Sequence, residues 1–264
     1  MVALRLFTLA WTYLRISIAN ELQYRVNFLI QILQSLIALV TGLIGLALVF
    51  NYTNELGGWS RPELLVVMGV HILMGGVIQA AIQPNMQRLM EEVQQGTLDF
   101  TLTKPADAQV LVSIREFRPW QIVDVTLGLV VLGIAVYQIK GQFGLWQALG
   151  FAAALLMGGI MIYCFCMMLT STVFWVIRLD EMVNLFQGVY AAGRWPVGIY
   201  PDWLRVGLTF LVPVAFAVTV PAEALTGRLT SATLLGAGVL TIFLVLLARG
   251  VWKLGLRNYS GASA

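Results

Sequence analysis

The sequence predicts an all-α integral membrane protein with six transmembrane helices. Hydrophobic residues make up 59% of its 264 residues and charged residues only 11%, whereas a soluble domain typically carries roughly 25% charge. The mean hydropathy is +0.84, and several apolar runs reach the roughly 20 residues that a helix needs to cross a bilayer. A soluble protein of this composition would lack the polar residues to cover its core, while lipid solvates apolar side chains directly.

The apolar runs and the polar breaks between them place the spans. A turn containing Gly57 and Gly58 separates the first two runs, and Pro62 can open the second helix. Arg178 marks a later aqueous turn. We therefore expect one transmembrane domain over residues 1–264, with spans at about 26–50, 62–84, 120–139, 146–177, 182–200 and 232–248.

Residues 1–25 predict an amphipathic helix in the membrane interface rather than a secretory signal. Phe7, Trp11, Leu14 and Ile18 fall on one face at helical spacing. Arg15 lies on the opposite face and interrupts the apolar stretch that a signal peptide would need.

Prolines break the region before the last span. Pro196, Pro201, Pro213 and Pro221 each remove a backbone donor, which a helix in lipid cannot lose without another partner. We expect residues 203–222 to form short re-entrant helices. A full crossing over this stretch is the weaker alternative, because it would place the basic C-terminal tail outside.

The basic residues predict that both termini lie in the cytoplasm. With six spans in that orientation, only five of the 16 Lys and Arg residues are outside, as the positive-inside rule favours: Arg61, Lys140, Arg194, Arg205 and Arg228. This bias also accounts for the net charge of +3. Because no basic run is longer than two residues, we expect no nucleic-acid partner.

Amides inside the spans predict either helix contacts or a solute path. Asn27, Gln31 and Gln34 share one face of the first span, and Gln79 and Gln83 share one face of the second. Amides are costly when they face lipid. Hydrogen bonding between helices and a substrate pathway explain these stripes equally well.

Two ionisable residues lie within the spans. His71 is near the middle of the second span, where an ionisable group is a functional candidate by default. A neutral histidine satisfied by a neighbouring helix is the favoured interpretation. Asp124, a few residues into the third span, is expected to reach back toward the cytoplasm or to pair with Arg118.

The stretch between the second and third spans predicts a short amphipathic helix. Met86, Leu89, Met90 and Val93 form an apolar stripe, and Gly96 suits a helix C-terminus. A helix of this kind on the cytoplasmic side is either a docking element for another protein or a plain interfacial helix.

We expect no catalytic, cofactor or metal site in this chain. It contains no G-x-x-x-x-G-K-[ST] phosphate loop and no G-x-S-x-G elbow, and one histidine excludes a multi-histidine metal site. Two alternative functions stay open. A membrane-embedded lipid-modifying enzyme would need clustered acids or histidines, and an ATP-independent secondary transporter would need a deep carboxylate such as Asp124.

Three motifs resemble the permease subunits of type-2 ATP-binding-cassette (ABC) exporters, in a branch of similar length. The motifs are Tyr24-Arg25-Val26-Asn27-Phe28; Gly96-Thr97-Leu98-Asp99 with Leu102 and Lys104-Pro105; and Arg194-Trp195-Pro196 through Tyr200-Pro201 to the tail from Trp252 to Ala262. The resemblance implies six spans, an interfacial N-terminal helix, a cytoplasmic coupling helix and re-entrant helices, in a bacterial plasma membrane.

The resemblance also implies partners and a transport cycle. Two permeases, identical or related, would join two copies of a soluble ATPase subunit that binds ATP and Mg²⁺. The cargo would be a lipid-like, drug-like or glycan molecule moved by export. The ATPase would contact the segment between spans two and three at Arg88, Glu91, Glu92, Gly96, Thr97, Leu98, Asp99 and Lys104.

Overall fold

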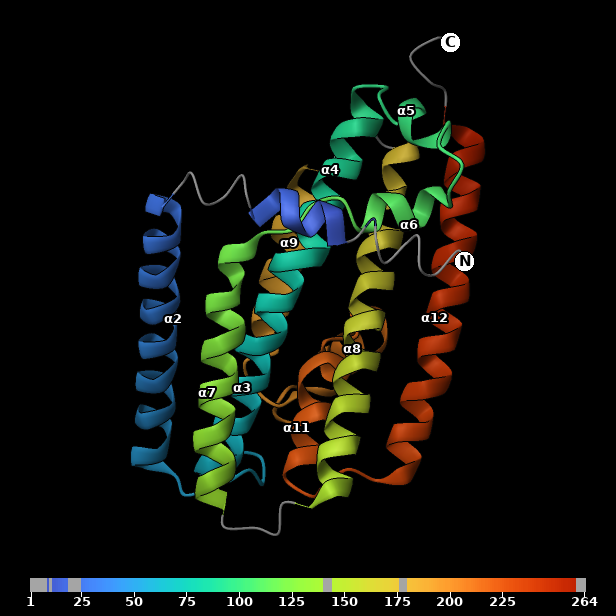
Figure 1. The fold of residues 1–264 in the computed structure, drawn as a ribbon. Helices are drawn as coiled ribbons and strands as arrows, with labels where there is room; N and C mark the ends of the chain where they lie inside the picture. Colours follow the sequence, from blue (N-terminus) through green and yellow to red (C-terminus); the bar gives the residue numbers. More distant parts are fainter. Residues whose placement is uncertain (1–8, 10, 19–24, 140–143, 176–179, 260–264) are drawn as a thin grey trace.

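The computed structural model describes residues 9, 11–18, 25–139, 144–175 and 180–259. Its long helices form a bundle with roughly aligned axes (Figure 1), and the described residues form no β-strand. The predicted all-α class is therefore confirmed. The α-helices are α2 (Arg25–Tyr52), α3 (Arg61–Val77), α4 (Gln83–Gln94), α5 (Asp99–Leu102), α6 (Ala108–Ser113), α7 (Ile122–Ile139), α8 (Leu145–Ser171), α9 (Asp180–Ala192), α10 (Asp202–Val206), α11 (Val220–Leu225) and α12 (Ser231–Asn258).

Shorter helical turns join several of these helices. Three are π-helical, at Ile78–Ile82, Gly207–Leu211 and Ala215–Thr219. Three are 3₁₀ turns, at Pro119–Gln121, Thr172–Phe174 and Val197–Ile199.

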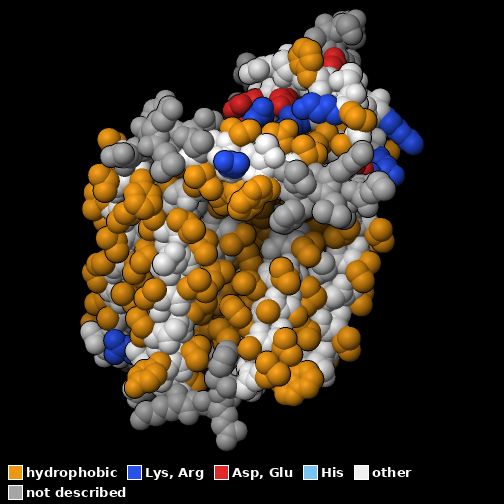
Figure 2. All heavy atoms as spheres, viewed as in Figure 1, with side chains coloured by type: hydrophobic (Ala, Val, Ile, Leu, Met, Phe, Trp, Pro, Cys, Tyr) orange, Lys and Arg blue, Asp and Glu red, His pale blue; other side chains and the backbone are white. Residues whose placement is uncertain are grey.

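Five helical runs among the described residues are long and apolar enough to cross a membrane. They are Phe28–Tyr52, Arg61–Gln94, Pro119–Ile139, Leu145–Phe174 and Ser231–Asn258. Hydrophobic side chains cover most of the visible bundle surface (Figure 2). Acidic and basic side chains gather at one end, over α4 to α6 (Figures 1 and 2). We call this end, formed by residues 85–118, the charged end. An apolar flank of this extent is typical of a protein that lies in lipid.

The second span is longer than the sequence predicted. We expected it to end at about residue 84 and a separate loop helix to follow, but the helix continues from Arg61 to Gln94. Pro84 leaves the carbonyl of Ala80 without its usual donor. The backbone N–H of Arg118 donates to that carbonyl at 2.9 Å, and a π-helical turn at Ile78–Ile82 absorbs the irregularity. The helix therefore passes the proline without breaking.

The segment expected as a span over 182–200 is helical only from Asp180 to Ala192, which is too short to cross a bilayer as a helix. Phe186 contacts Phe165 of α8, with ring centroids 6.0 Å apart. Farther along, the side chain of Ile199 packs against Gly57 in the α2–α3 loop. The chain therefore runs along the bundle from α8 to that loop, with its last part outside helix α9.

Residues 202–225 form a bent pair of helices. Asp202–Leu211 and Ala215–Leu225 meet at 78°. Ile199, just before the pair, packs on Gly57, and Arg228, just after it, donates to the carbonyl of Gly58 at 2.8 Å. Both ends of the pair therefore lie beside the same loop. We call this pair, Asp202 to Leu225, the hairpin.

Other boundaries also differ from the expected ones. The last helix continues to Asn258 rather than ending near 248, so that Arg249, Lys253 and Arg257 lie on it. The fourth run ends at Phe174, and the rest of its expected range reaches residues outside the described set. Of the expected interfacial helix 1–25, residues 11–18 are helical and lie crosswise to α2 (Figure 1).

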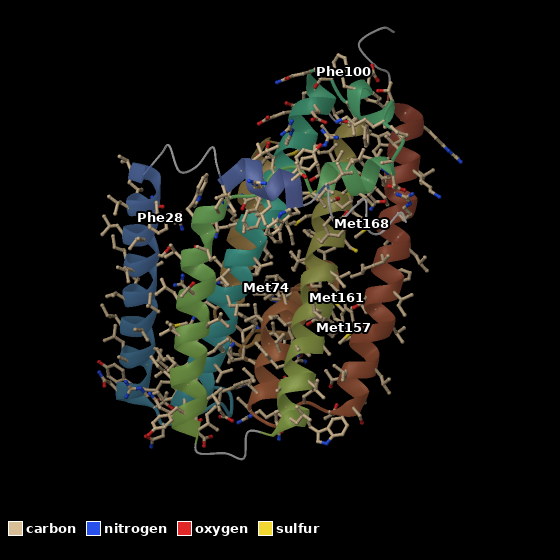
Figure 3. All side chains as sticks on the ribbon, viewed as in Figure 1. Phe28, Met74, Phe100, Met157, Met161 and Met168 are labelled. Carbon is tan, nitrogen blue, oxygen red and sulfur yellow. The ribbon has the colours of Figure 1, made fainter. Side chains whose placement is uncertain are left out.

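The core is centred on α3. Helix α3 crosses α7 so closely that a Cβ added to Gly128 of α7 would lie 2.5 Å from the backbone nitrogen of Leu73 of α3. Met74 and Met161 are buried in the interior (Figure 3). By contrast α2, which carries the exposed Phe28, is the least buried of the five long runs. The bundle is therefore tight around α3, α7 and α8 and loose at α2.

Candidate functional site

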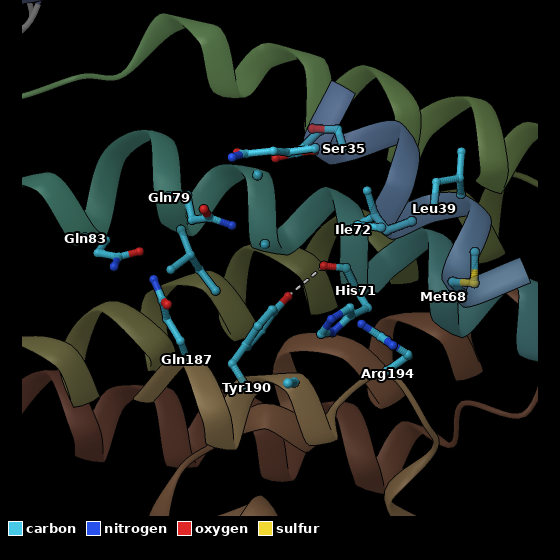
Figure 4. Close-up of a pocket in the computed structure, with 18 of the residues that line it drawn as sticks. Ser35, Leu39, Met68, His71, Ile72, Gln79, Gln83, Gln187, Tyr190 and Arg194 are labelled. Carbon is cyan, nitrogen blue, oxygen red and sulfur yellow. Dashed lines mark hydrogen bonds between the residues drawn. The ribbon is translucent and has the colours of Figure 1, made fainter. Parts of the chain in front are cut away.

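A polar cavity of about 360 Å³ lies between α2, α3 and α9. Five of the six amide and histidine residues singled out from the sequence line it: Gln31, Gln34, His71, Gln79 and Gln83. The sixth, Asn27, has a side chain outside the described set. Figure 4 shows labelled side chains from all three helices around this space. The two amide stripes therefore meet at one cavity, although they come from different spans.

The amides at the cavity are only partly paired with one another. Gln31 donates to the hydroxyl of Ser35 at 3.2 Å and to the carboxylate of Asp124 at 3.1 Å. Gln79 accepts a long hydrogen bond of 3.4 Å from Gln121. Gln34 has no side-chain hydrogen bond with any described residue, so part of this polar surface is free to meet a solute or water.

Asp124 faces the cavity rather than the charged end. The expectation that it pairs with Arg118 is wrong, because Arg118 instead donates to Gln87 at 2.8 Å. Asp124 also lines the cavity wall. Its carboxylate is held by the amide of Gln31, one of the residues that the sequence marked on the opposite helix.

His71 stacks on Tyr190 of α9. Their ring centroids are 4.6 Å apart with an angle of 16° between the planes, and the Tyr190 hydroxyl donates to the His71 carbonyl at 2.8 Å (Figure 4). A neighbouring helix does contact this histidine, as the favoured interpretation required. Its Nδ1 atom, however, is buried and has no hydrogen-bond partner among the described residues.

Arg194 also lines the cavity, which the sequence did not indicate. We counted it on the outer side, near the end of the span expected over residues 182–200. It follows α9, and its guanidinium lies next to the imidazole of His71 (Figure 4). The sequence did not indicate this position because the expected span extended the helix to residue 200. Because α9 ends at Ala192, the next residues bend back toward the bundle.

A glycine ends α4 at the charged end. Gly96 has a φ of +70°, the left-handed conformation that glycine adopts without strain. Its N–H donates to the carbonyl of Val93 at 3.2 Å, and the N–H of Thr97 donates to the carbonyl of Glu92 at 2.8 Å. These two bonds form a Schellman motif, which ends the helix and turns the chain toward α5.

Arg115 locks the segment after α4 to the helix itself. Its side chain is only 6% exposed and donates to Glu92 at 2.5 Å and to the hydroxyl of Thr101. Arg88 donates to Glu92 at 3.2 Å and also pairs with Glu116. Through Arg115, the carboxylate of Glu92 on α4 is connected to α5 and to the segment that leads into α7.

Asn85 holds the same chain segment through its side-chain amide. Its oxygen accepts from the backbone N–H groups of Arg115 and Glu116, both at 2.9 Å. Its nitrogen donates to the carbonyls of Ala81 and Glu116, both at 2.7 Å. All the hydrogen-bonding capacity of this buried amide is used, so the segment is fixed against the end of the span.

Helix α6 connects the charged end to α8 and α12. Asp107 caps α6 by accepting from the N–H groups of Gln109 and Val110, and its carboxylate also pairs with Arg249 of α12. The hydrogen bond from Arg249 holds the pKa of Asp107 below its usual value. The hydrogen bonds from the two backbone N–H groups lower this pKa further. The hydroxyls of Ser113 and Tyr163 are 2.7 Å apart. Helix α6 is therefore attached to both neighbouring long helices.

The residues proposed for ATPase contact do not all face outward. Glu92 and Leu98 are turned inward, since Glu92 forms the ion pairs above and Leu98 is fully buried. Glu91 and Lys104 are exposed. Arg88 is exposed but paired, Gly96 and Thr97 form the turn, and Asp99 begins α5.

Phe100 is an exposed aromatic residue that the sequence analysis did not single out. It is 75% exposed and lies on α5, at the tip of the charged end (Figure 3). The signal available in the sequence was a lone aromatic in a polar loop. Outside the apolar flank, an exposed aromatic side chain offers an apolar contact to a neighbouring protein.

The described residues contain no group of three or more His, Cys, Asp and Glu side chains that could hold a metal ion. The polar cavity and the charged end both belong to the same bundle. Helix α3 with α4 connects them, since the run Arg61–Gln94 carries His71 at one level and Glu92 at the other.

Comparison with known proteins identifies the family. No curated protein and no solved structure matches the chain. A family model described as "ABC-2 family transporter protein" matches residues 36–263, which is most of the chain. This match agrees with the resemblance to type-2 ABC permeases and with the apolar helices of the bundle. The chain is a multi-pass membrane protein that belongs to the ABC-2 transporter family.

Proposed function

We propose that this chain is the permease subunit of an ATP-driven exporter, with the charged end in the cytoplasm of a bacterial cell. Family membership implies an ABC ATPase as a partner subunit. The chain has no phosphate loop of its own. ATP and Mg²⁺ would then bind to the partner, and this chain would supply the pathway.

The attachment of the charged end to several long helices carries this proposal. Arg115 and Glu92 join α5 to α4 and to the start of the third span, and Arg249 and Asp107 join α6 to α12. A force applied at α5 would therefore reach α3, α7 and α12 together. An interface that can move helices as a group is the kind of element that couples two sites.

Phe100, Glu91 and Lys104 form the surface that we assign to ATPase docking. All three are exposed, and Phe100 lies on α5 at the charged end (Figure 3). Aromatic residues in the centre of a polar contact area supply most of the affinity in many interfaces. In this proposal Glu92 transmits the movement through its ion pairs rather than touching the ATPase.

The hairpin is proposed to be re-entrant, entering from the outer side and returning to it. Its two ends lie beside Gly57 and Gly58 in the same loop. With this path the basic residues Arg249, Lys253 and Arg257 lie on the cytoplasmic side, which agrees with the positive-inside rule. Both termini would then be cytoplasmic.

A second permease, either another copy or a related chain, is proposed to pack along α2. This helix is long and apolar but is the least buried of the five runs, and several of its large side chains are exposed, among them Leu33 and Ile37. A pathway between two permeases would border the cavity that α2 closes on one side.

The test is co-purification followed by transport. The tagged chain is expected to bring down a soluble ABC ATPase from its own membranes, and Phe100→Glu should abolish that recovery. Tyr137→Glu changes an 88% exposed residue on α7 instead and should leave recovery unchanged. Solute movement by the purified chain without an ATPase would contradict the proposal, and its loss in Asp124→Asn would then indicate a secondary transporter.

A further inference from the structure

The polar cavity holds a cation without a paired anion. Arg194 lines it and forms no ion pair with any carboxylate of the described residues. The cavity's own carboxylate, Asp124, is held by Gln31. Guanidinium stays protonated in proteins, and the exposed Arg194 side chain presents its charge at the cavity wall. The cavity therefore favours an anionic ligand at Arg194.

Further polar atoms converge on the same place. The Nδ1 atom of His71 is buried and unpaired, and the ring lies beside the Arg194 guanidinium (Figure 4). Buried polar atoms normally have a partner, so this nitrogen is available to a ligand that binds beside the Arg194 guanidinium. Arginine with a neighbouring donor is the arrangement that binds phosphate and carboxylate oxygens.

An apolar cavity adjoins the polar one. It has a volume of about 690 Å³, lies between α2, α3 and α7, and is lined mostly by Leu, Ile and Val side chains. Leu39 of α2 borders both cavities. Because α2 is the least buried long helix, the wall that α2 contributes to both cavities is their most loosely packed side.

We propose that the two cavities together bind an amphiphile with an anionic head group, and that this amphiphile is the substrate class of the permease. The phosphate or carboxylate of the head group is held by Arg194 and His71, and the alkyl chain occupies the cavity beside Leu39. The assignment rests on the proposed permease function only in calling the ligand a substrate. Binding itself needs neither the ATPase nor nucleotide.

Three probes separate the parts of this site in a binding titration of the purified chain in neutral detergent. They are short-chain phosphatidic acid, diacylglycerol with the same chains, and glycerol 3-phosphate. Phosphatidic acid should bind most tightly. Arg194→Gln should weaken it roughly tenfold or more, which corresponds to the loss of a charge-assisted hydrogen bond, and Arg194→Lys should weaken it less.

Matched controls distinguish a site from general charge effects. Arg205→Gln removes the same charge from α10, where the exposed Arg205 pairs with Asp202 at 2.7 Å, and should leave affinity unchanged. Leu39→Trp should fill the junction of the cavities and weaken phosphatidic acid severalfold while sparing glycerol 3-phosphate. It also keeps the test decisive if Arg194→Gln does not fold.

Three results would overturn the proposal. Equal affinity for phosphatidic acid and diacylglycerol would remove the anion site, and equal affinity for phosphatidic acid and glycerol 3-phosphate would remove the chain site. An equal loss in Arg205→Gln and Arg194→Gln would indicate nonspecific electrostatics. None of these results bears on ATPase recovery, so a failure here leaves the permease proposal standing.

Discussion

Replacing Arg115 by Met should loosen the charged end without unfolding the bundle. The Arg115 side chain is 6% exposed and makes two hydrogen bonds, to Glu92 and Thr101. Methionine has a similar length but no charge and no donor. The change therefore removes both bonds and leaves the packing volume nearly filled.

The free-energy cost of this substitution depends on the ion pair with Arg88 that Glu92 retains. Removing one partner of a buried ion pair typically costs about 3–5 kcal/mol. Glu92 retains Arg88 at 3.2 Å, and its side chain is 15% exposed, so the loss is smaller. We expect about 2 kcal/mol, which makes local opening of residues 97–102 roughly 30-fold more frequent.

Hydrogen–deuterium exchange measures this opening directly. The N–H groups of Thr97 and Leu98 donate to the carbonyl of Glu92, and they should exchange faster in Arg115→Met while α8 and α12 stay protected. Arg118→Met is the control, because the Arg118 side chain bonds only Gln87 among the described residues. Equal acceleration in both variants, or none in Arg115→Met, would refute the assignment of Arg115 as the lock.

Three further predictions concern packing, pH and the outer loop. Gly128→Ala should destabilise the protein by about 1–3 kcal/mol in thermal unfolding, because its Cβ would meet the α3 backbone at 2.5 Å. The lowered pKa of Asp107 means that its contribution to stability is full above the unfolded-state pKa of about 3.9 and is lost as pH falls through the folded-state pKa, so proteolysis near α6 should accelerate in that acidic window. Arg228→Gln should lower the unfolding midpoint, because Arg228 pairs with Glu63 at 2.8 Å and lies 4.8 Å from the ring centroid of Trp59.

Each of these has its own control. Gly133→Ala, on the same helix with no atom near its Cβ, should be neutral, and an equal cost there would contradict the packing explanation. Asp107→Asn keeps a good N-cap but should abolish the acid dependence, and an unchanged acid profile would show that another group is responsible. Arg205→Gln should shift the midpoint less than Arg228→Gln does; the reverse order would contradict the role of Arg228.

Composition and periodicity were sufficient for the fold class, because lipid imposes a simple length and polarity requirement on each helix. They were insufficient where tertiary contacts replaced a lost backbone bond. Pro84 looked like the end of a span, and only the distant N–H of Arg118, which donates to Ala80, shows why the helix continues. No local pattern contains that partner.

The candidate site was predictable only where local helical spacing determines it. The amide stripes of Gln31 and Gln79 could be identified from helical spacing, and both line one cavity. Arg194 could not, since its position depends on where α9 ends. The inward orientation of Glu92 depends on Arg115, which lies 23 residues farther along the chain.

The central claim is that an ABC ATPase docks on the cytoplasmic surface around Phe100. A photo-crosslinking amino acid placed at Phe100, which is 75% exposed, should form an adduct with that ATPase in intact membranes. The same group at Trp146, which is 83% exposed at the opposite end of the bundle, should form none. An ATPase adduct at Trp146, or its absence at Phe100 while the two proteins still co-purify, would contradict the account.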